Sequence, residues 1–147
     1  MARNYIQGKF TPQNPSKYEG DVTTIFARSS WEMKFLIWCD RDPAVLKYSS
    51  EEVVVPYIKP TDNKVHRYFV DAKITVKDTA GNIKTYLIEI KPYSQTKPPV
   101  VKARKTKAYI DAVMTWAVND AKWKAARVYA KKTGCEFKIL TEHDLKM

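Results

Sequence analysis

Cysteine and histidine are scarce in this chain. The two cysteines, Cys39 and Cys135, lie far apart in the sequence, and no pair of histidines accompanies either of them. A disulfide framework or a zinc site needs more thiols or imidazoles at close spacing, so neither is expected. We expect two inert thiols in a reducing compartment.

Long apolar runs are also absent. No stretch approaches the roughly 20 apolar residues that cross a bilayer. The first ten residues, MARNYIQGKF, lack the apolar block of a signal peptide, and no lipidation signal is visible. The sequence therefore predicts no membrane association and a protein that stays where it is made.

Acidic residues are few relative to basic ones. The chain has 16 Asp and Glu against 26 Lys and Arg, a net charge of +10. Such an excess favours a polyanionic partner, with nucleic acid first and a membrane surface as the competitor. The 147 residues, 44% of them hydrophobic, fit a single domain over residues 1–147. Its residues 1–20 carry Pro and Gly among basic residues, which is typical of an irregular N-terminal arm.

Hydrophobic periodicity predicts an α/β domain, a mixed sheet of about four strands flanked by helices. Pro56 indicates that the first strand lies at an edge or carries a bulge. Trp116 and Trp123 are expected in the core. Gly134 is expected to stop the second helix. The predicted elements are two helices, over residues 29–39 and 102–132, and four strands, over residues 51–58, 66–78, 85–92 and 135–140.

Two charged residues interrupt the strand TYLIEIKP, and they share one face. Glu89 and Lys91 are two residues apart, so their side chains point the same way. The preceding strand forms a hairpin that turns near Gly81, which places Asp71 opposite Glu89, with Cβ atoms roughly 5 Å apart. Facing carboxylates repel each other unless a cation lies between them. Their oxygen ligands suit Mg²⁺, which polarises phosphoryl oxygens and activates water.

Other charged residues could take part in such a site, and each of them also has a plainer interpretation. Lys91 would orient or deprotonate a water or hold a scissile phosphate, and Glu32 on the first helix would complete the site. Alternatively, Glu89 and Lys91 belong to a solvated strand face, and Glu32 only stabilises its helix end. The run KARKTK is either a solvated face or a set of phosphate contacts. Its basic residues are Lys102, Arg104, Lys105 and Lys107.

The ordered set of Glu32 on a helix, Asp71 on a strand and Glu89-Ile90-Lys91 on the next strand resembles the PD-(D/E)xK nuclease superfamily. The flanking words YLIEIKPYSQTKPP and FKILTEHDL resemble those of TnsA-type transposon endonucleases. They are more similar still to the head completion nucleases of T-even-like tailed phages. One departure is Val70, where that superfamily usually has proline before the aspartate.

The resemblance implies the PD-(D/E)xK fold and a Mg²⁺-dependent DNA endonuclease, with Mn²⁺ as a substitute metal. It implies that Asp71, Glu89 and the Ile90 carbonyl bind the metal, that Lys91 is the catalytic lysine and that Glu32 is the helix glutamate. The implied partners are double-stranded DNA and head, portal or neck proteins.

The implied role is processing of the packaged DNA end in the host cytoplasm before tail attachment, with retention in the virion left open. The alternative is a non-catalytic structural plug that binds the DNA end at the head portal vertex.

Overall fold

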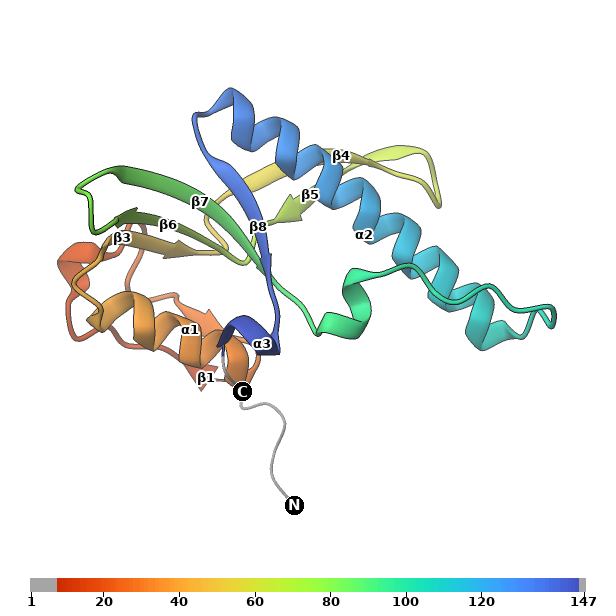
Figure 1. The fold of residues 1–147 in the computed structure, drawn as a ribbon, viewed down its shortest axis with the longest axis horizontal. Helices are drawn as coiled ribbons and strands as arrows, with labels where there is room; N and C mark the ends of the chain where they lie inside the picture. Colours follow the sequence, from red (N-terminus) through yellow and green to blue (C-terminus); the bar gives the residue numbers. More distant parts are fainter. Residues whose placement is uncertain (1–7, 146–147) are drawn as a thin grey trace, which may run out of the picture.

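A four-stranded mixed sheet forms the centre of the molecule. The computed structural model describes residues 8–145. The sheet has the order β3-β6-β7-β8, in which the first three strands are antiparallel and β8 runs parallel to β7 (Figure 1). This confirms the predicted mixed sheet of about four strands. The strands are β3 (Val45–Ser50), β6 (Ala72–Lys77), β7 (Ile83–Ile90) and β8 (Glu136–Leu140).

Helices cover both faces of this sheet, because alternation along the strands makes both faces apolar. On one face, Phe35 of α1 belongs to the same core as Ile88 of β7. On the other, Trp123 of α2 belongs to the same core as Leu87 of β7. Within residues 8–145, no helix combines the length and apolar character that a bilayer crossing requires. The helices are α1 (Ser30–Arg41), α2 (Lys107–Lys132) and α3 (Glu142–Leu145), with the 3-10 turns η1 (Pro15–Lys17) and η2 (Tyr93–Thr96).

Residues 66–78 form two strands where the sequence predicts one. β5 (Lys64–Phe69) pairs with β4 (Val54–Lys59) in a separate two-stranded sheet, and β6 begins only at Ala72. Pro56 therefore lies on a strand whose one neighbour, among the described residues, is β5. This agrees with the edge position predicted for it.

The break between β5 and β6 sends the two strands to opposite cores. Tyr68 and Val70 lie in the core beneath α2, whereas Ala72 and Ile74 lie in the core beneath α1. In the single continuous strand predicted over residues 66–78, alternation would place all four side chains on one face. This prediction is wrong, because alternation does not continue through the bend. Asp71 is the residue at the bend, immediately before β6.

The edge strand β3 is not predicted by the sequence. Val45 and Tyr48 are buried and Lys47 is exposed, but a shift in register between Val45 and Lys47 interrupts the regular alternation. The strand predicted over residues 51–58 instead supplies β4 of the small sheet.

Helix α2 begins five residues later than predicted. The side chain of Thr106 accepts a hydrogen bond from the backbone N–H of Tyr109 at 3.1 Å, so Thr106 is the N-cap. Residues 102–106 precede the helix as a loop. The helix ends at Lys132, and Gly134 follows with a φ of 76°, as expected for a left-handed stop.

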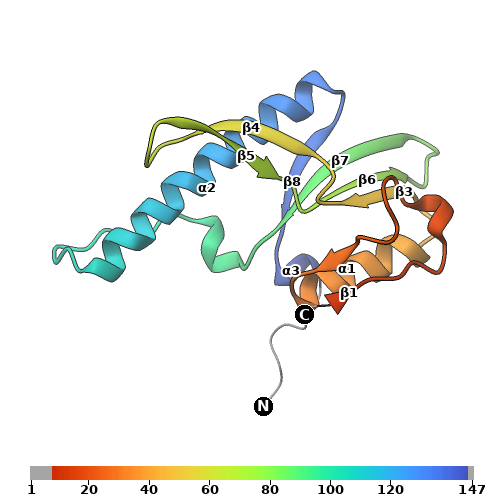
Figure 2. The ribbon, with the colours of Figure 1, turned by 180° about the vertical axis from the view of Figure 1, so that it is seen from behind.

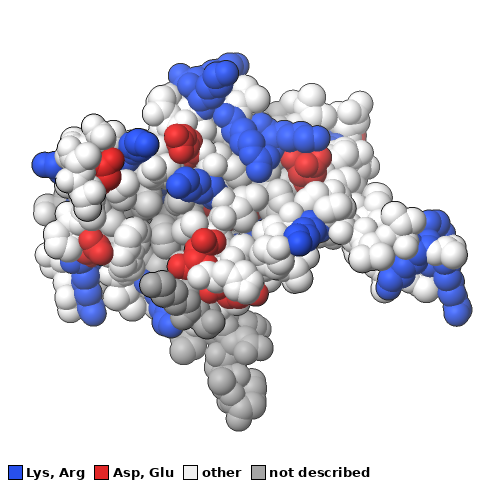
Figure 3. All heavy atoms as spheres, viewed as in Figure 1, with Lys and Arg blue, Asp and Glu red and all other residues white. Residues whose placement is uncertain are grey.

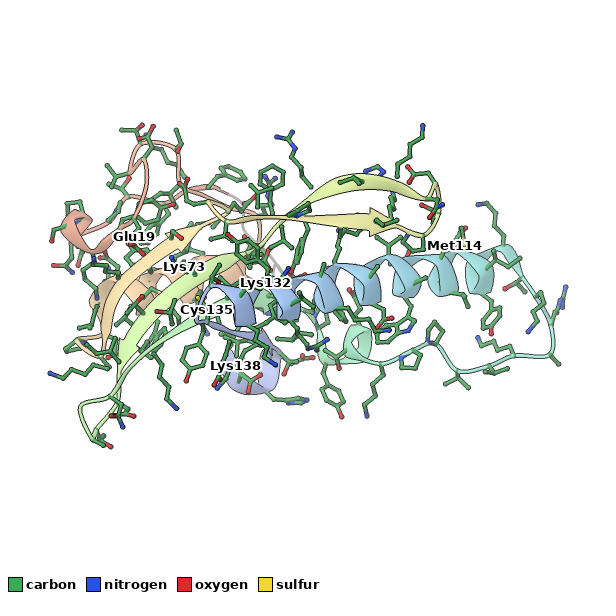
Figure 4. The ribbon with its side chains drawn as sticks, turned by 90° about the horizontal axis from the view of Figure 1, so that it is seen from above. Glu19, Lys73, Met114, Lys132, Cys135 and Lys138 are labelled. Atoms are coloured by element: carbon green, nitrogen blue, oxygen red, sulfur yellow. The ribbon has the colours of Figure 1, made fainter. Side chains whose placement is uncertain are left out.

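Part of α2 and the loop before it project beyond the sheet when the molecule is viewed from either side (Figures 1 and 2). We define residues 97–114 as the projecting arm. Figure 4 shows the β4–β5 hairpin beside α2 and ending near Met114, so the helix beyond this residue has no strand beside it. Val100, Val101 and Ile110 of the projecting arm are exposed. This part of the helix therefore lacks the apolar burial that holds the rest of α2.

The segment predicted as an N-terminal arm over residues 1–20 packs on the body from Gly8 onward. β1 (Gly8–Lys9) pairs with β2 (Phe26–Ala27), and Phe10 and Tyr18 are buried in the core beneath α1. The first seven residues of that predicted arm lie outside the described part of the chain.

Candidate active site

The ends of two neighbouring strands bring the predicted carboxylates together. In the β6–β7 hairpin, Ala72 pairs with Ile88, so the next pair outward is Asp71 and Glu89. A hydrogen bond reinforces this approach, because the backbone N–H of Ile90 donates to Oδ2 of Asp71 at 2.7 Å. The predicted opposition of Asp71 and Glu89 thus follows from the register.

Glu89 is 5% exposed and its carboxylate is held from two sides. The hydroxyl of Tyr68 donates to Oε1 at 2.6 Å, and Nζ of Lys91 lies 3.8 Å from Oε2. Burial and the charge of Glu89 raise the pKa of Tyr68, so the phenol stays protonated as a donor. The solvated-face interpretation of Glu89 is wrong, since its side chain is buried.

Tyr68 was not among the residues predicted for the site. Sequence alternation placed it on a continuous strand facing a core, and the bend before Asp71 is what turns its hydroxyl to Glu89. The sequence does contain one signal for Tyr68. A tyrosine expected in the core needs a hydrogen-bond partner for its hydroxyl, and the predicted carboxylates are close by.

Asp71 carries the most perturbed carboxyl group of the site. Burial raises its pKa well above the ordinary value, and the negative charge of Glu89 raises it further. The hydrogen bond from Ile90 acts in the opposite direction, while the charge of Glu32 and a hydrogen bond to Glu89 add to the increase. Asp71 therefore retains a proton at pH values where an ordinary aspartate is ionised.

Glu32 serves its helix end and also faces the site. The side chain of the N-cap Ser29 accepts from the backbone N–H of Glu32 at 3.2 Å, and Oε1 of Glu32 accepts from the N–H of Arg28, one residue before the N-cap, at 3.4 Å. Burial raises the pKa of Glu32, and the charges of Glu51 and Glu89 contribute to the increase. Glu32 and Asp71 line the same small pocket between α1 and β6. The role of Glu32 at its helix end is therefore confirmed, and its part in the site stays a prediction.

An ion pair forms the rim of the site on the side of α1. Nε of Arg28 lies 3.0 Å from Oε2 of Glu51, and a second guanidinium nitrogen donates to Oε1 at 3.1 Å. The φ of Glu51 is 53°, a left-handed conformation uncommon outside glycine, and its N–H donates to the carbonyl of Asp71 at 3.1 Å. Strained backbone of this kind clusters at functional sites. No pattern in the sequence predicts this pair.

The predicted DNA contacts lie at the projecting arm, away from the carboxylates. Figure 3 shows Lys and Arg gathered at its tip. Lys107 pairs with Asp111 at 3.1 Å, and Nζ of Lys105 lies 4.9 Å from the ring centre of Tyr109. Among the described residues, no carboxylate pairs with Lys102, Arg104 or Lys105. The arm has five cationic residues and one acidic residue, namely Lys97, Lys102, Arg104, Lys105, Lys107 and Asp111.

The donor set suits a hard cation that keeps several waters. In residues 8–145, no three His, Cys, Asp or Glu side chains gather closely enough to hold a metal ion by themselves. Asp71 and Glu89 form a pair, and Glu32 is near enough to affect the pKa of Asp71 without joining them. All their donors are oxygens, and Mg²⁺ commonly binds one or two carboxylates. Without a cation, the proton on Asp71 reduces the repulsion between the carboxylates of Asp71 and Glu89, and a bound cation would reduce it in the same way.

Comparison with known families decides the class to which this site belongs. A family model described as TnsA-like endonuclease N terminal matches residues 42–142. The chain belongs to the TnsA-like endonuclease family. The matched range contains Asp71, Glu89 and Lys91, whereas Glu32 precedes it. Together with the mixed sheet flanked by helices, this TnsA-like endonuclease has the PD-(D/E)xK fold that the sequence predicted.

A curated relative extends over almost the whole chain. This TnsA-like endonuclease is similar to the "Head completion nuclease" of Enterobacteria phage T4, with 43% identity over 143 residues. The alignment covers 95% of this chain and 93% of the relative. No solved structure gives a significant match.

Proposed function

We propose that this protein is a divalent-metal-dependent DNA endonuclease that processes the packaged DNA end during phage head completion. The observation that carries the proposal is the pair of carboxylates, Asp71 and Glu89, brought together at the bend before β6 and the end of β7 with Lys91 beside them. A scaffold protein has no need for two carboxylates placed side by side, where the charge of Glu89 opposes ionisation of Asp71.

In this proposal the metal is Mg²⁺, for which Mn²⁺ substitutes, held by Asp71, Glu89 and the backbone carbonyl of Ile90. When bound, such an ion polarises the phosphodiester and lowers the pKa of bound water. The hydrogen bonds of Tyr68 to Glu89 and of Ile90 to Asp71 fix the two carboxylates in place before any ligand arrives. Preorganisation of this kind lowers the reorganisation needed during reaction.

Lys91 and Glu32 have separate parts in the proposed reaction. Nζ of Lys91 lies 3.8 Å from Glu89, as a hydrogen-bond donor next to the proposed metal ligands. We assign it to the scissile phosphate, where it stabilises the negative charge that develops on the phosphoryl oxygens. Glu32 adds a carboxylate from α1 that lines the same small pocket as Asp71, and we assign it to orienting the attacking water.

The projecting arm supplies affinity for duplex DNA without reading its sequence. Its exposed Lys102, Arg104, Lys105 and Lys107 would contact phosphates and release counterions. Along α2, Lys107 is about 15 residues from Lys122, next to the carboxylates, and this corresponds to ~22 Å of helix. At about 3.4 Å per base-pair step, the tip would meet the duplex six to seven base pairs from the cut.

The biological setting in this proposal comes from the phage T4 relative, whose name is head completion nuclease. Its similarity over almost the whole chain supports the same task here. The protein would act in the host cytoplasm while heads mature, on the packaged DNA end and next to portal or neck proteins.

A cleavage assay on linear, circular and branched DNA tests the proposal. We expect cutting of at least one form in Mg²⁺ or Mn²⁺, no cutting in EDTA, and none by Lys91→Ala. If the wild-type protein binds DNA but cuts no form with either metal, and neither metal raises its melting temperature, the structural plug replaces the nuclease.

A further inference from the structure

A second lysine stands next to the carboxylates, on an element that the motif does not include. Lys122 lies on the face of α2 that covers the sheet, between the buried residues Asn119 and Trp123. Its Nζ is 5.6 Å from the ring centre of Tyr68 and 5.9 Å from that of Tyr57. Tyr68 is the residue whose hydroxyl holds Glu89. Lys122 thus reaches the site across a tyrosine platform.

Among the described residues, Lys122 feels charges of both signs but has no carboxylate in direct contact. Burial lowers its pKa, Glu89 and Asp71 attract its charge, and Lys91 and Lys59 repel it. Within the described part of the chain, the side chain of Lys122 forms no ion pair and no hydrogen bond. A partly buried ammonium of this kind is stabilised by an anion that approaches it.

Two further lysines from separate elements lie close enough to Lys122 to repel its charge. Lys91 follows β7, Lys122 lies on α2 and Lys59 ends β4. Like charges gathered in this way cost free energy in the unliganded protein, and a phosphodiester chain would offset that cost. The tyrosine rings beneath Lys122 restrict its motion, which favours a defined contact over a diffuse one.

We propose that Lys122 is a phosphate-binding residue that holds the scissile strand of DNA at the phosphate next to the one being cut. This inference rests on the proposed function, because it names a further contact of the same site. Lys91 binds the scissile phosphate and Lys122 binds its neighbour, so two consecutive phosphates fix the strand across Glu89. Lys59 lies farther along β4 and continues the same basic track.

The chain offers a matched control on the same helix. Lys124 is two residues from Lys122, is 72% exposed and pairs with Asp120 at 2.9 Å. Two residues along a helix correspond to about 200° of rotation, so Lys124 points away from the sheet. Lys122→Met keeps the apolar stem over the tyrosines and removes the charge. Lys122→Arg keeps the charge.

The test measures binding and cleavage separately. Binding to a synthetic duplex oligonucleotide is measured against salt in the Asp71→Asn background without metal, where no cutting occurs. We expect Lys122→Met to reduce the slope of log affinity against log salt by about 0.9, the value for one phosphate contact. In the otherwise wild-type protein, which keeps Asp71, and with metal present, we expect Lys122→Met to lower single-turnover cleavage ~10- to 100-fold. Lys122→Arg should keep most of both, and Lys124→Met should leave the cleavage rate unchanged.

Three results would overturn the inference. The first is a salt slope for Lys122→Met equal to that of its parent. The second is equal loss of cleavage in the Lys122→Met and Lys124→Met variants. The third is a loss that follows a fall in melting temperature in both Lys122→Met and Lys122→Arg, which would make Lys122 a structural counterion of Glu89. Since the salt slope needs no cutting, a wild-type protein that fails to cut DNA counts against the proposed function and leaves this measurement valid.

Discussion

The sheet end that holds the carboxylates and the projecting arm are built in opposite ways. Glu89 is buried and Asp71 is half-buried, and both are hydrogen-bonded and set by strand register, so a small displacement would separate them. The projecting arm has exposed cations and exposed apolar residues and lacks a strand beside it. Chemistry demands fixed geometry, whereas attraction to a phosphate backbone depends mainly on charge and tolerates imprecision.

The largest expected effect separates chemistry from binding. Asp71→Asn and Glu89→Gln keep the side-chain shapes and remove the charges proposed to hold the metal. Cleavage should fall at least ~10³-fold, and DNA affinity should stay within about threefold, because the projecting arm is untouched. Single-turnover cleavage and fluorescence anisotropy measure the two quantities. Cutting at the wild-type rate by either variant would refute the site.

The converse change should affect binding and leave chemistry intact. Replacing Lys102, Arg104, Lys105 and Lys107 by alanine should lower the salt slope of DNA binding by about three to four, near 0.9 for each phosphate contact. Cleavage at saturating DNA should be unchanged. The matched control, with alanine at the four exposed lysines Lys77, Lys84, Lys131 and Lys132, alters the body of the molecule away from the carboxylates. A control slope reduced as much as the arm slope would show that charge anywhere on the surface suffices.

Metal-free stability should depend on pH through Asp71. Its pKa is raised in the folded state, so the folded protein keeps a proton that the unfolded chain releases above about pH 3.9. The contribution of this group is therefore fully present below that pH and is lost as pH rises toward the raised pKa. Asp71→Asn should melt a few degrees higher than wild type at pH 8, on the order of 1 kcal/mol, and the difference should shrink at pH 5.

The same melting experiment tests the metal. Mg²⁺ or Mn²⁺ should raise the melting temperature of the wild type, because a ligand that binds only the folded state stabilises it. Asp71→Asn should lose that rise. A melting difference that stays constant between pH 5 and pH 8 would show that Asp71 does not titrate as described.

The smallest expected effect concerns the orientation of Glu89. Tyr68→Phe removes the hydroxyl that donates to Oε1 and keeps the ring beneath Lys122. The loss of one hydrogen bond to a charged group predicts roughly a tenfold fall in cleavage. The concentration of Mg²⁺ at half-maximal rate should rise, while the melting temperature should change little. Equal metal dependence in the variant and the wild type would assign Tyr68 to packing alone.

The sequence predicts the hairpin and its carboxylates well, because both follow from short-range patterns. The turn at Gly81 and the alternation of β7 place Asp71 opposite Glu89 without tertiary information. The bend at Asp71 is different, because the chain there changes its pairing partner from β4 to β3, which lies far from it in sequence. Local alternation does not reveal such a change of partner. For this reason the prediction that Tyr68 and Ala72 lie on the same face was wrong.

The residues missed around the site share the same cause. The position of Tyr68 depends on the bend before β6. The position of Glu51 depends on its own left-handed backbone between β3 and β4, and that of Lys122 depends on the packing of α2 over the small sheet. Each acquires its neighbour through a contact between elements distant in sequence. The start of α2 was missed for a local reason, since Thr106 caps the helix although basic residues with good helix propensity precede it.

The parallel pairing of β7 and β8 makes α2 a crossover connection that leaves and re-enters the sheet at adjacent strands. Residues 97–114 are thus part of the connection between two neighbouring strands, β7 and β8. Inserting or deleting a whole turn there would move the tip by about 5.4 Å and leave the strand pairing as it is. If the arm contacts DNA as proposed, a change in its length would alter the reach along a duplex and leave the strands that carry Asp71 and Glu89 as they are.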